Sequence, residues 1–78
     1  MITKEQVEEG REYFFASPFK GAPYNQGSVE TLFSWLTDED IQIVKDVLGD
    51  RCFTVPVSDW TDMDNRAMNV ISWLTHFE

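Results

Sequence analysis

Hydrophobic and polar residues follow a helical period along most of this chain. The first such stretch covers residues 4–15, and Thr3 and Gln6 have the spacing of a capping box at its start. One face carries the apolar positions Val7, Gly10 and Phe14. The opposite face carries four carboxylates at offsets of three and four residues: Glu5, Glu8, Glu9 and Glu12. The pattern predicts an amphipathic helix with an acidic outer face.

The middle of the chain predicts a loop and two short helices. Residues 17–27 hold two Pro, two Gly and Asn25, which is typical of turns, and the apolar Phe19 and Tyr24 within this loop are expected to cover the core. Ser28 is the expected cap of a helix over 29–36. Its apolar positions are Val29, Leu32, Phe33 and Leu36, with Trp35 to one side.

A third helix is expected after Thr37, which is a good N-cap residue. Three acidic residues follow it, and negative charge is favourable at the N-terminus of a helix. These acids are Asp38, Glu39 and Asp40. The apolar face continues to Leu48, and Gly49 suits the left-handed conformation that ends many helices.

The period changes to two over residues 51–57, where Phe53, Val55 and Val57 alternate with other side chains. That pattern is typical of a strand, although Pro56 would confine it to a sheet edge or an extended connection. We therefore expect an extended segment here, with pairing in a sheet as an alternative.

The last helix is predicted to start after Ser58 or Thr61 and to run to Phe77. Its apolar face consists of Ala67, Val70, Ile71, Leu74 and Phe77, with Met63 at its start. Its polar side consists of Asn65, Asn69, Ser72 and His76, and we place Met68 on that side. The fold predicted for residues 1–78 is one mainly α domain of about four helices, the second and third short, with a minor β element near 51–57 or an α+β fold as the alternative.

Composition narrows the class of protein. The 78 residues include 14 Asp and Glu against 6 Lys and Arg, a net charge of −8, while hydrophobic residues make up 42%. An acidic chain is a poor binder of DNA, RNA or anionic membranes, which require clustered cations, and its apolar content is too high for a disordered tail. There is neither a signal-like N-terminus nor an apolar run of membrane-spanning length, and the single Cys suits a reducing compartment, so we expect a cytoplasmic protein.

Enzymatic chemistry is not expected. His76 is the only histidine, and Cys52 lies in an apolar segment where a buried, inert thiol is usual, so a Cys–His dyad is disfavoured. The run from Asp62 to Asn65 resembles the start of a calcium loop but lacks the glycine and the closing glutamate of that motif. No phosphate-binding glycine loop is present. We therefore predict no enzyme, no metal site and no cofactor.

Two features point to a binding surface. Acidic residues gather on the first helix and at the start of the third, whereas several aromatic residues lie off the predicted core faces, as expected of rings that anchor interfaces. The simpler interpretation is that the acids form solvated helix faces and the rings cap the core. The residues predicted to contact a partner are Glu5, Glu8, Glu9, Glu12, Asp38, Glu39, Asp40, Trp35, Trp60, Trp73 and Tyr24.

In size, charge and helix layout the chain is similar to small acidic inhibitors, often encoded by phages, such as anti-CRISPR and anti-restriction proteins. The resemblance includes no motif, so it assigns no residue. It implies an inhibitor or regulator that occupies the basic, nucleic-acid-binding surface of a larger protein or ribonucleoprotein, without binding nucleic acid or membranes itself. The alternative is a structural or assembly module, such as a homodimer, whose 51–57 segment and aromatic residues meet a second copy.

Overall fold

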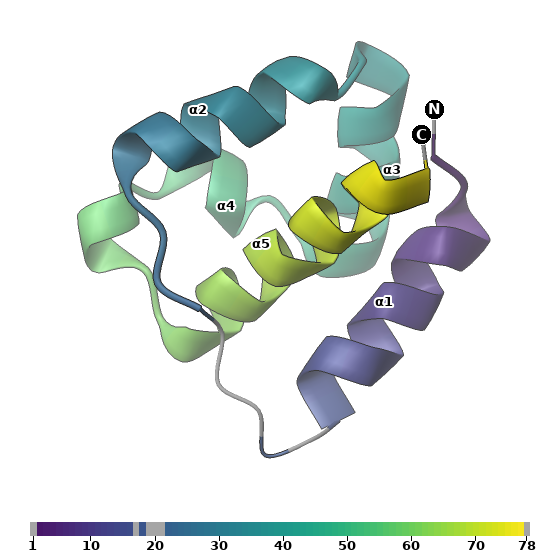
Figure 1. The fold of residues 1–78 in the computed structure, drawn as a ribbon, viewed down its shortest axis with the longest axis horizontal. Coiled ribbons are helices and arrows are strands. Elements are labelled where there is room, and N and C mark those ends of the chain that lie inside the picture. Colours follow the sequence, from purple (N-terminus) through teal and green to yellow (C-terminus); the bar gives the residue numbers. More distant parts are fainter. Residues whose placement is uncertain (1, 17, 19–21, 78) are drawn as a thin grey trace.

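A computed structural model describes the backbone of residues 2–16, 18 and 22–77 and shows a bundle of helices (Figure 1). The α-helices are α1 (Lys4–Ala16), α2 (Gln26–Trp35), α3 (Asp38–Leu48), α4 (Arg51–Thr54) and α5 (Asp62–Leu74), with 3-10 turns η1 (Val57–Asp59) and η2 (Thr75–Phe77). The described residues contain no strand, which confirms the mainly α fold over the α+β alternative. No helix among them is both long enough and apolar enough to span a bilayer.

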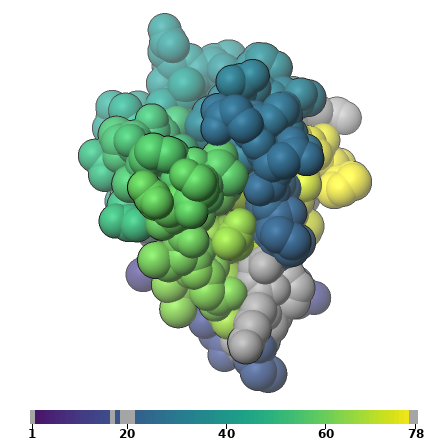
Figure 2. Space-filling view, turned by 90° about the vertical axis from the view of Figure 1, so that its left-hand side faces the viewer, coloured from purple at the N-terminus to yellow at the C-terminus, as the bar shows by residue number. Residues whose placement is uncertain are grey.

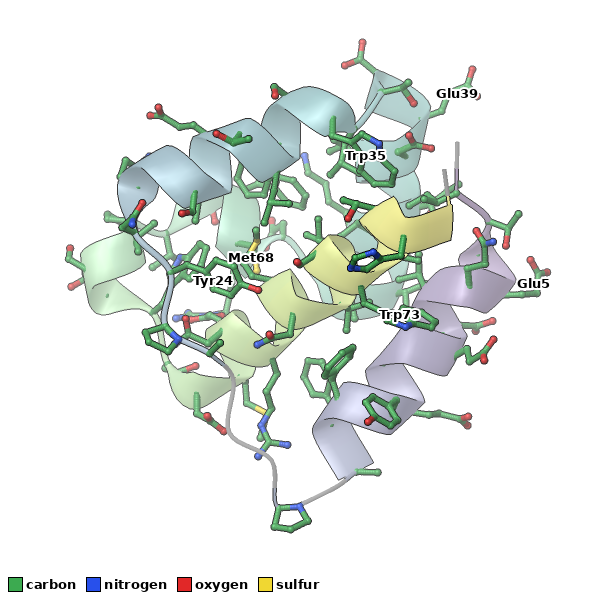
Figure 3. The ribbon with its side chains drawn as sticks, viewed as in Figure 1. Glu5, Tyr24, Trp35, Glu39, Met68 and Trp73 are labelled. Carbon is green, nitrogen blue, oxygen red and sulfur yellow. The ribbon has the colours of Figure 1, made fainter. Side chains whose placement is uncertain are left out.

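Helix α5 forms the centre of the bundle. It crosses the middle of the molecule and packs against α1 on one side and against α2 and α4 on the other, while α3 packs against α1 (Figure 1). Its side chains are buried around most of the helix: Ala67, Met68, Val70, Ile71 and Leu74. The placement of Met68 on the polar side is therefore wrong. Its side chain has no exposed surface and points to the side of α5 that faces α2 and α4 (Figure 3).

The segment predicted to be extended is instead helical. Residues 51–54 form α4, in which the Val55 N–H donates to the Arg51 carbonyl at 2.8 Å, and η1 follows directly. Pro56 has no backbone N–H to donate within a sheet, and the described residues include no strand that could pair with this segment. A helical turn therefore gives more of its backbone N–H and carbonyl groups a hydrogen-bond partner. The alternating apolar residues Phe53, Val55 and Val57 are half-buried, and Phe53 stacks on Phe33 of α2 with ring centroids 4.7 Å apart.

Side-chain caps explain where the helices begin. Thr3 and Gln6 exchange both bonds of the predicted capping box. Thr37 caps α3 as predicted, and Thr61, one of the two expected starting points of the last helix, caps α5. Helix α2 begins earlier than expected, because Asn25 is its cap and accepts the Ser28 N–H at 2.8 Å. Phe19 and the side chain of Phe77 lie outside the described part of the chain.

Two buried carboxylates hold the ends of helices together. Asp40 is only 2% exposed and accepts the N–H groups of Thr37 and, from across the fold, Ile2. Asp64 accepts the Thr61 N–H and forms a two-point ion pair with Arg51 at 3.0 Å for each contact. Burial raises the pKa of Asp40, but these hydrogen bonds outweigh it and the pKa is lowered. The Arg51 guanidinium, chiefly, lowers the pKa of Asp64.

These lowered pKa values predict acid sensitivity. The stabilisation is complete above the unfolded-state pKa of about 3.9 and is lost as the pH falls through the lower folded-state values. We expect the urea midpoint to vary little between about pH 7 and pH 5 and to fall below about pH 4. Asp64→Asn should lower the midpoint at neutral pH and flatten the fall in acid, whereas Asp46→Asn at an exposed position should do neither. An acid limb as steep in Asp64→Asn as in the wild type would contradict this assignment.

Candidate protein-binding site

The four predicted glutamates of α1 are all exposed: Glu5, Glu8, Glu9 and Glu12. Among the described residues no ion pair joins any of them to Lys4 or Arg11. Their carboxylates therefore form one stripe of negative charge along the outside of the helix. We call these four residues the α1 acidic stripe.

Helix α1 is fixed at both of its ends, so the stripe is presented on a rigid support. At the start, the Ile2 N–H donates to Asp40 at the first turn of α3. At the end, the buried guanidinium of Arg66 donates from Nη1 to the carbonyls of Phe14 (2.9 Å) and Phe15 (3.3 Å). These carbonyls belong to the last turn of α1, where no intrahelical donor is available.

The middle of α1 lies in direct contact with α5. A Cβ atom added at Gly10 would lie 2.7 Å from Val70 Cγ1 and 2.9 Å from Trp73 Cζ3, so only glycine permits this approach. Figure 3 shows Trp73 reaching from α5 towards α1. Gly10 therefore sets the position of the Trp73 ring beside the acidic stripe.

An open groove of about 730 Å³ results, lined by Glu9, Glu12, Tyr13, Phe14 and Trp73. Its rings form a short series of edge contacts: Tyr13 meets Phe14 at 4.9 Å between centroids, and Phe14 meets Trp73 at 6.4 Å. Tyr13 is 71% exposed, so most of its side chain faces solvent. We call these five residues the acidic–aromatic groove.

The second predicted acidic patch is only partly available. Asp38 and Glu39 are exposed at the start of α3. Asp40 is buried and its carboxylate oxygens accept hydrogen bonds from backbone N–H groups, so it cannot contact a partner at the surface. Because Asp40 also holds Ile2, the first turns of α1 and α3 lie near each other. Glu5 and Glu39 accordingly project on the same side of the molecule (Figure 3).

Of the predicted aromatic contacts, only Trp73 lines the groove with members of the stripe. Trp35, Trp60 and Tyr24 are half-buried and packed against the core. The Trp60 indole N–H donates to the Val55 carbonyl at 2.9 Å. The Tyr24 hydroxyl donates to Asn69 Oδ1 at 3.2 Å, and burial raises its pKa. Figure 3 shows Tyr24, Trp35 and Trp73 spread around α5 rather than gathered on one face.

A second depression lies between α2 and residues 52–57, which are side by side in Figure 2. It measures about 330 Å³, and the described residues that line it are uncharged, mainly Val29, Phe33, Phe53 and Val57. The described residues that line it thus differ in chemistry from those of the acidic–aromatic groove.

The residues considered for catalysis or metal binding either lie far apart in the fold or already pair with arginine side chains. Cys52 is buried against the first turn of α5, where its thiol contacts the Asp64 carbonyl, and burial, chiefly, raises its pKa to about 12. His76 follows the other end of α5, a 13-residue helix that spans about 20 Å. Asp62 pairs with Arg66 at 2.8 Å, as Asp64 does with Arg51. No group of three metal-ligating side chains occurs within the described residues.

Two residues of the site were missed or underrated from sequence. Tyr13 was assigned no role, although it lies four residues after Glu9 and therefore beside it on the helix surface. Gly10 was placed on the apolar face, but nothing in one sequence shows that a tryptophan packs against it. The helical spacing could have indicated Tyr13, whereas the contact at Gly10 required the fold.

Comparison of the chain with protein-family models, with curated proteins and with solved structures found no match. The similarity to anti-defence inhibitors covers only size, charge and helix layout.

Proposed function

We propose that this protein is a protein-binding inhibitor or regulator that occupies a basic, nucleic-acid-binding surface of a larger partner. The observation that carries the proposal is the acidic–aromatic groove, where two members of the acidic stripe share one surface with an exposed tyrosine. Carboxylates supply charge complementarity to Lys and Arg, while a desolvated ring supplies an anchor. A solvated, purely solubilising helix face would not need the aromatic component.

The mode of inhibition follows from the charge. Phosphate-binding surfaces hold clustered Lys and Arg side chains, and a rigid row of carboxylates competes for the same cations. With a net charge of −8, the field of the whole protein steers it towards such surfaces and away from nucleic acid itself. By analogy, the partner would be a defence complex of the kind that phage-encoded inhibitors block in the host cytoplasm.

The alternative of a homo-oligomeric assembly module rests on two features, an unpaired extended segment at residues 51–57 and the aromatic residues off the predicted core faces. Those residues form α4 and η1, with the Phe53 and Val55 N–H groups bonded locally. Residues 51–57 therefore offer no strand edge for pairing with a second copy.

Neutralising the stripe tests the proposal. The stripe-neutralised variant combines four substitutions: Glu5→Gln, Glu8→Gln, Glu9→Gln and Glu12→Gln. Its capture of the partner from a nuclease-treated bacterial lysate should be at least about tenfold lower than that of the wild type. Each exposed charge pair contributes up to about 1 kcal/mol, so four together reach that range. Wild-type capture should also weaken as salt is raised.

The matched control removes the same amount of charge from exposed positions outside the stripe: Glu30→Gln, Asp46→Asn, Asp50→Asn and Asp59→Asn. We expect it to retain most of the capture. Equal loss in both variants would reduce the effect to net charge, and full capture by the stripe variant would exclude α1 as the contact.

A further inference from the structure

We propose that the acidic–aromatic groove receives an arginine side chain of the partner, whose guanidinium stacks on Tyr13 between the carboxylates of Glu9 and Glu12. This inference rests on the proposed function and specifies the chemistry that the groove recognises. It concerns one pocket within the larger acidic surface, so it can fail while that surface still binds a basic partner.

The arrangement of the three residues carries the inference. Glu9 and Tyr13 are four residues apart on α1, so their side chains are neighbours, and Glu12 lines the same groove. Neither carboxylate pairs with a cation among the described residues. Tyr13 leaves most of its surface to solvent while its contact with Phe14 supports the ring from within the fold. A cation above Tyr13 would thus meet a ring and two carboxylates together.

The groove matches arginine better than lysine. A guanidinium is planar, weakly hydrated and able to stack on an aromatic face while its N–H groups reach carboxylates in a fork. A lysine ammonium is a strongly hydrated point charge that gains less from a ring. The apolar sides of Phe14 and Trp73 offer a surface for the methylene stem of the arginine.

Other occupants conflict with the charges of the groove. A phosphate or an acidic peptide would meet two carboxylates of the same sign. A purely apolar helix or loop would cover Glu9 and Glu12 without supplying a partner, which disfavours burial of the charged groups. A cationic side chain with an apolar stem can pair its charge with the carboxylates of the groove while its stem contacts the aromatic rings.

The test is an NMR titration with two blocked pentapeptides of equal charge, Gly-Arg-Gly-Arg-Gly and Gly-Lys-Gly-Lys-Gly. We expect the arginine peptide to bind at least about threefold more tightly and to shift the Tyr13 ring and Trp73 indole signals first. Tyr13→Ala should remove the preference for arginine while leaving the affinity for the lysine peptide within about twofold. Tyr13 is exposed, so the variant is expected to fold.

Charge removal provides the second arm. Glu9→Gln with Glu12→Gln should weaken binding of both peptides, whereas Glu30→Gln with Asp46→Asn, which removes equal charge elsewhere, should leave the preference intact. Equal affinities for the two peptides, or a preference that survives Tyr13→Ala, would overturn the arginine assignment. In that case, loss of partner capture by the stripe-neutralised variant in the lysate experiment would support the proposed function without the arginine pocket. Capture of the partner by that variant at the wild-type level would contradict both the proposed function and the arginine pocket.

Discussion

Met68→Ala should remove about 2–5 kcal/mol from the free energy of unfolding, which is a large share of the roughly 4–12 kcal/mol expected for a chain of this length. Met68 has no exposed surface and belongs to the same buried core cluster as Ile71 and Leu74. Truncation removes buried methylene and thioether groups and leaves a cavity that a close-packed core closes only in part.

A matched control is available on the same helix. Met63 is 53% exposed near the start of α5, so Met63→Ala should change the unfolding free energy by no more than about 0.5 kcal/mol. Urea denaturation followed by circular dichroism measures both variants. Similar losses in the two, or a negligible loss at Met68, would contradict the core described here.

Gly10→Ala should destabilise the protein by about 1–2 kcal/mol, although alanine is the better helix former by about 1 kcal/mol. The added Cβ would lie 2.7 Å from Val70 Cγ1, and Val70 is completely buried, so α1 and α5 must move apart. The variant should also shift the Trp73 ring and therefore weaken binding of the arginine peptide to the groove.

Gly27→Ala makes the same change in α2, where the new Cβ has only an ordinary contact, 3.5 Å from Asn25 Oδ1. It should be neutral or stabilising by up to about 1 kcal/mol. The two glycine variants should therefore differ by about 1–3 kcal/mol in thermal or urea unfolding. A stabilised Gly10→Ala protein would show that α1 and α5 do not approach each other as closely as described.

Local signals were sufficient to predict much of the fold. The capping boxes at Thr3 and Thr61 and the acids after Thr37 mark helix starts because they bind backbone N–H groups a few residues away. Gly49 ends α3 with the positive φ that its position predicted, +86°, but its ψ of 177° lies outside the left-handed helical region. The α1 acidic stripe also follows from helical spacing alone, and its members are exposed as expected.

The errors arose where tertiary contacts decide between local alternatives. A seven-residue alternation at 51–57 fits a strand or a helical turn, and packing of Phe53 on Phe33 selects the turn. Asp40 looked like another surface acid of α3, but its bond to Ile2 spans 38 residues of chain. Met68 lies off the predicted apolar face and is buried because neighbours cover α5 on more than one side.

Competition with nucleic acid tests the central claim most directly. With the captured partner purified, its affinity for DNA or RNA would be measured at increasing concentrations of this protein, and again with the stripe-neutralised variant. We predict that binding of this protein and of nucleic acid to the partner is mutually exclusive. The apparent dissociation constant for nucleic acid should then rise in proportion to the concentration of the wild-type protein. It should stay nearly constant when the stripe-neutralised variant is added instead. A stable ternary complex of partner, nucleic acid and this protein, with the affinity for nucleic acid unchanged, would contradict the proposal.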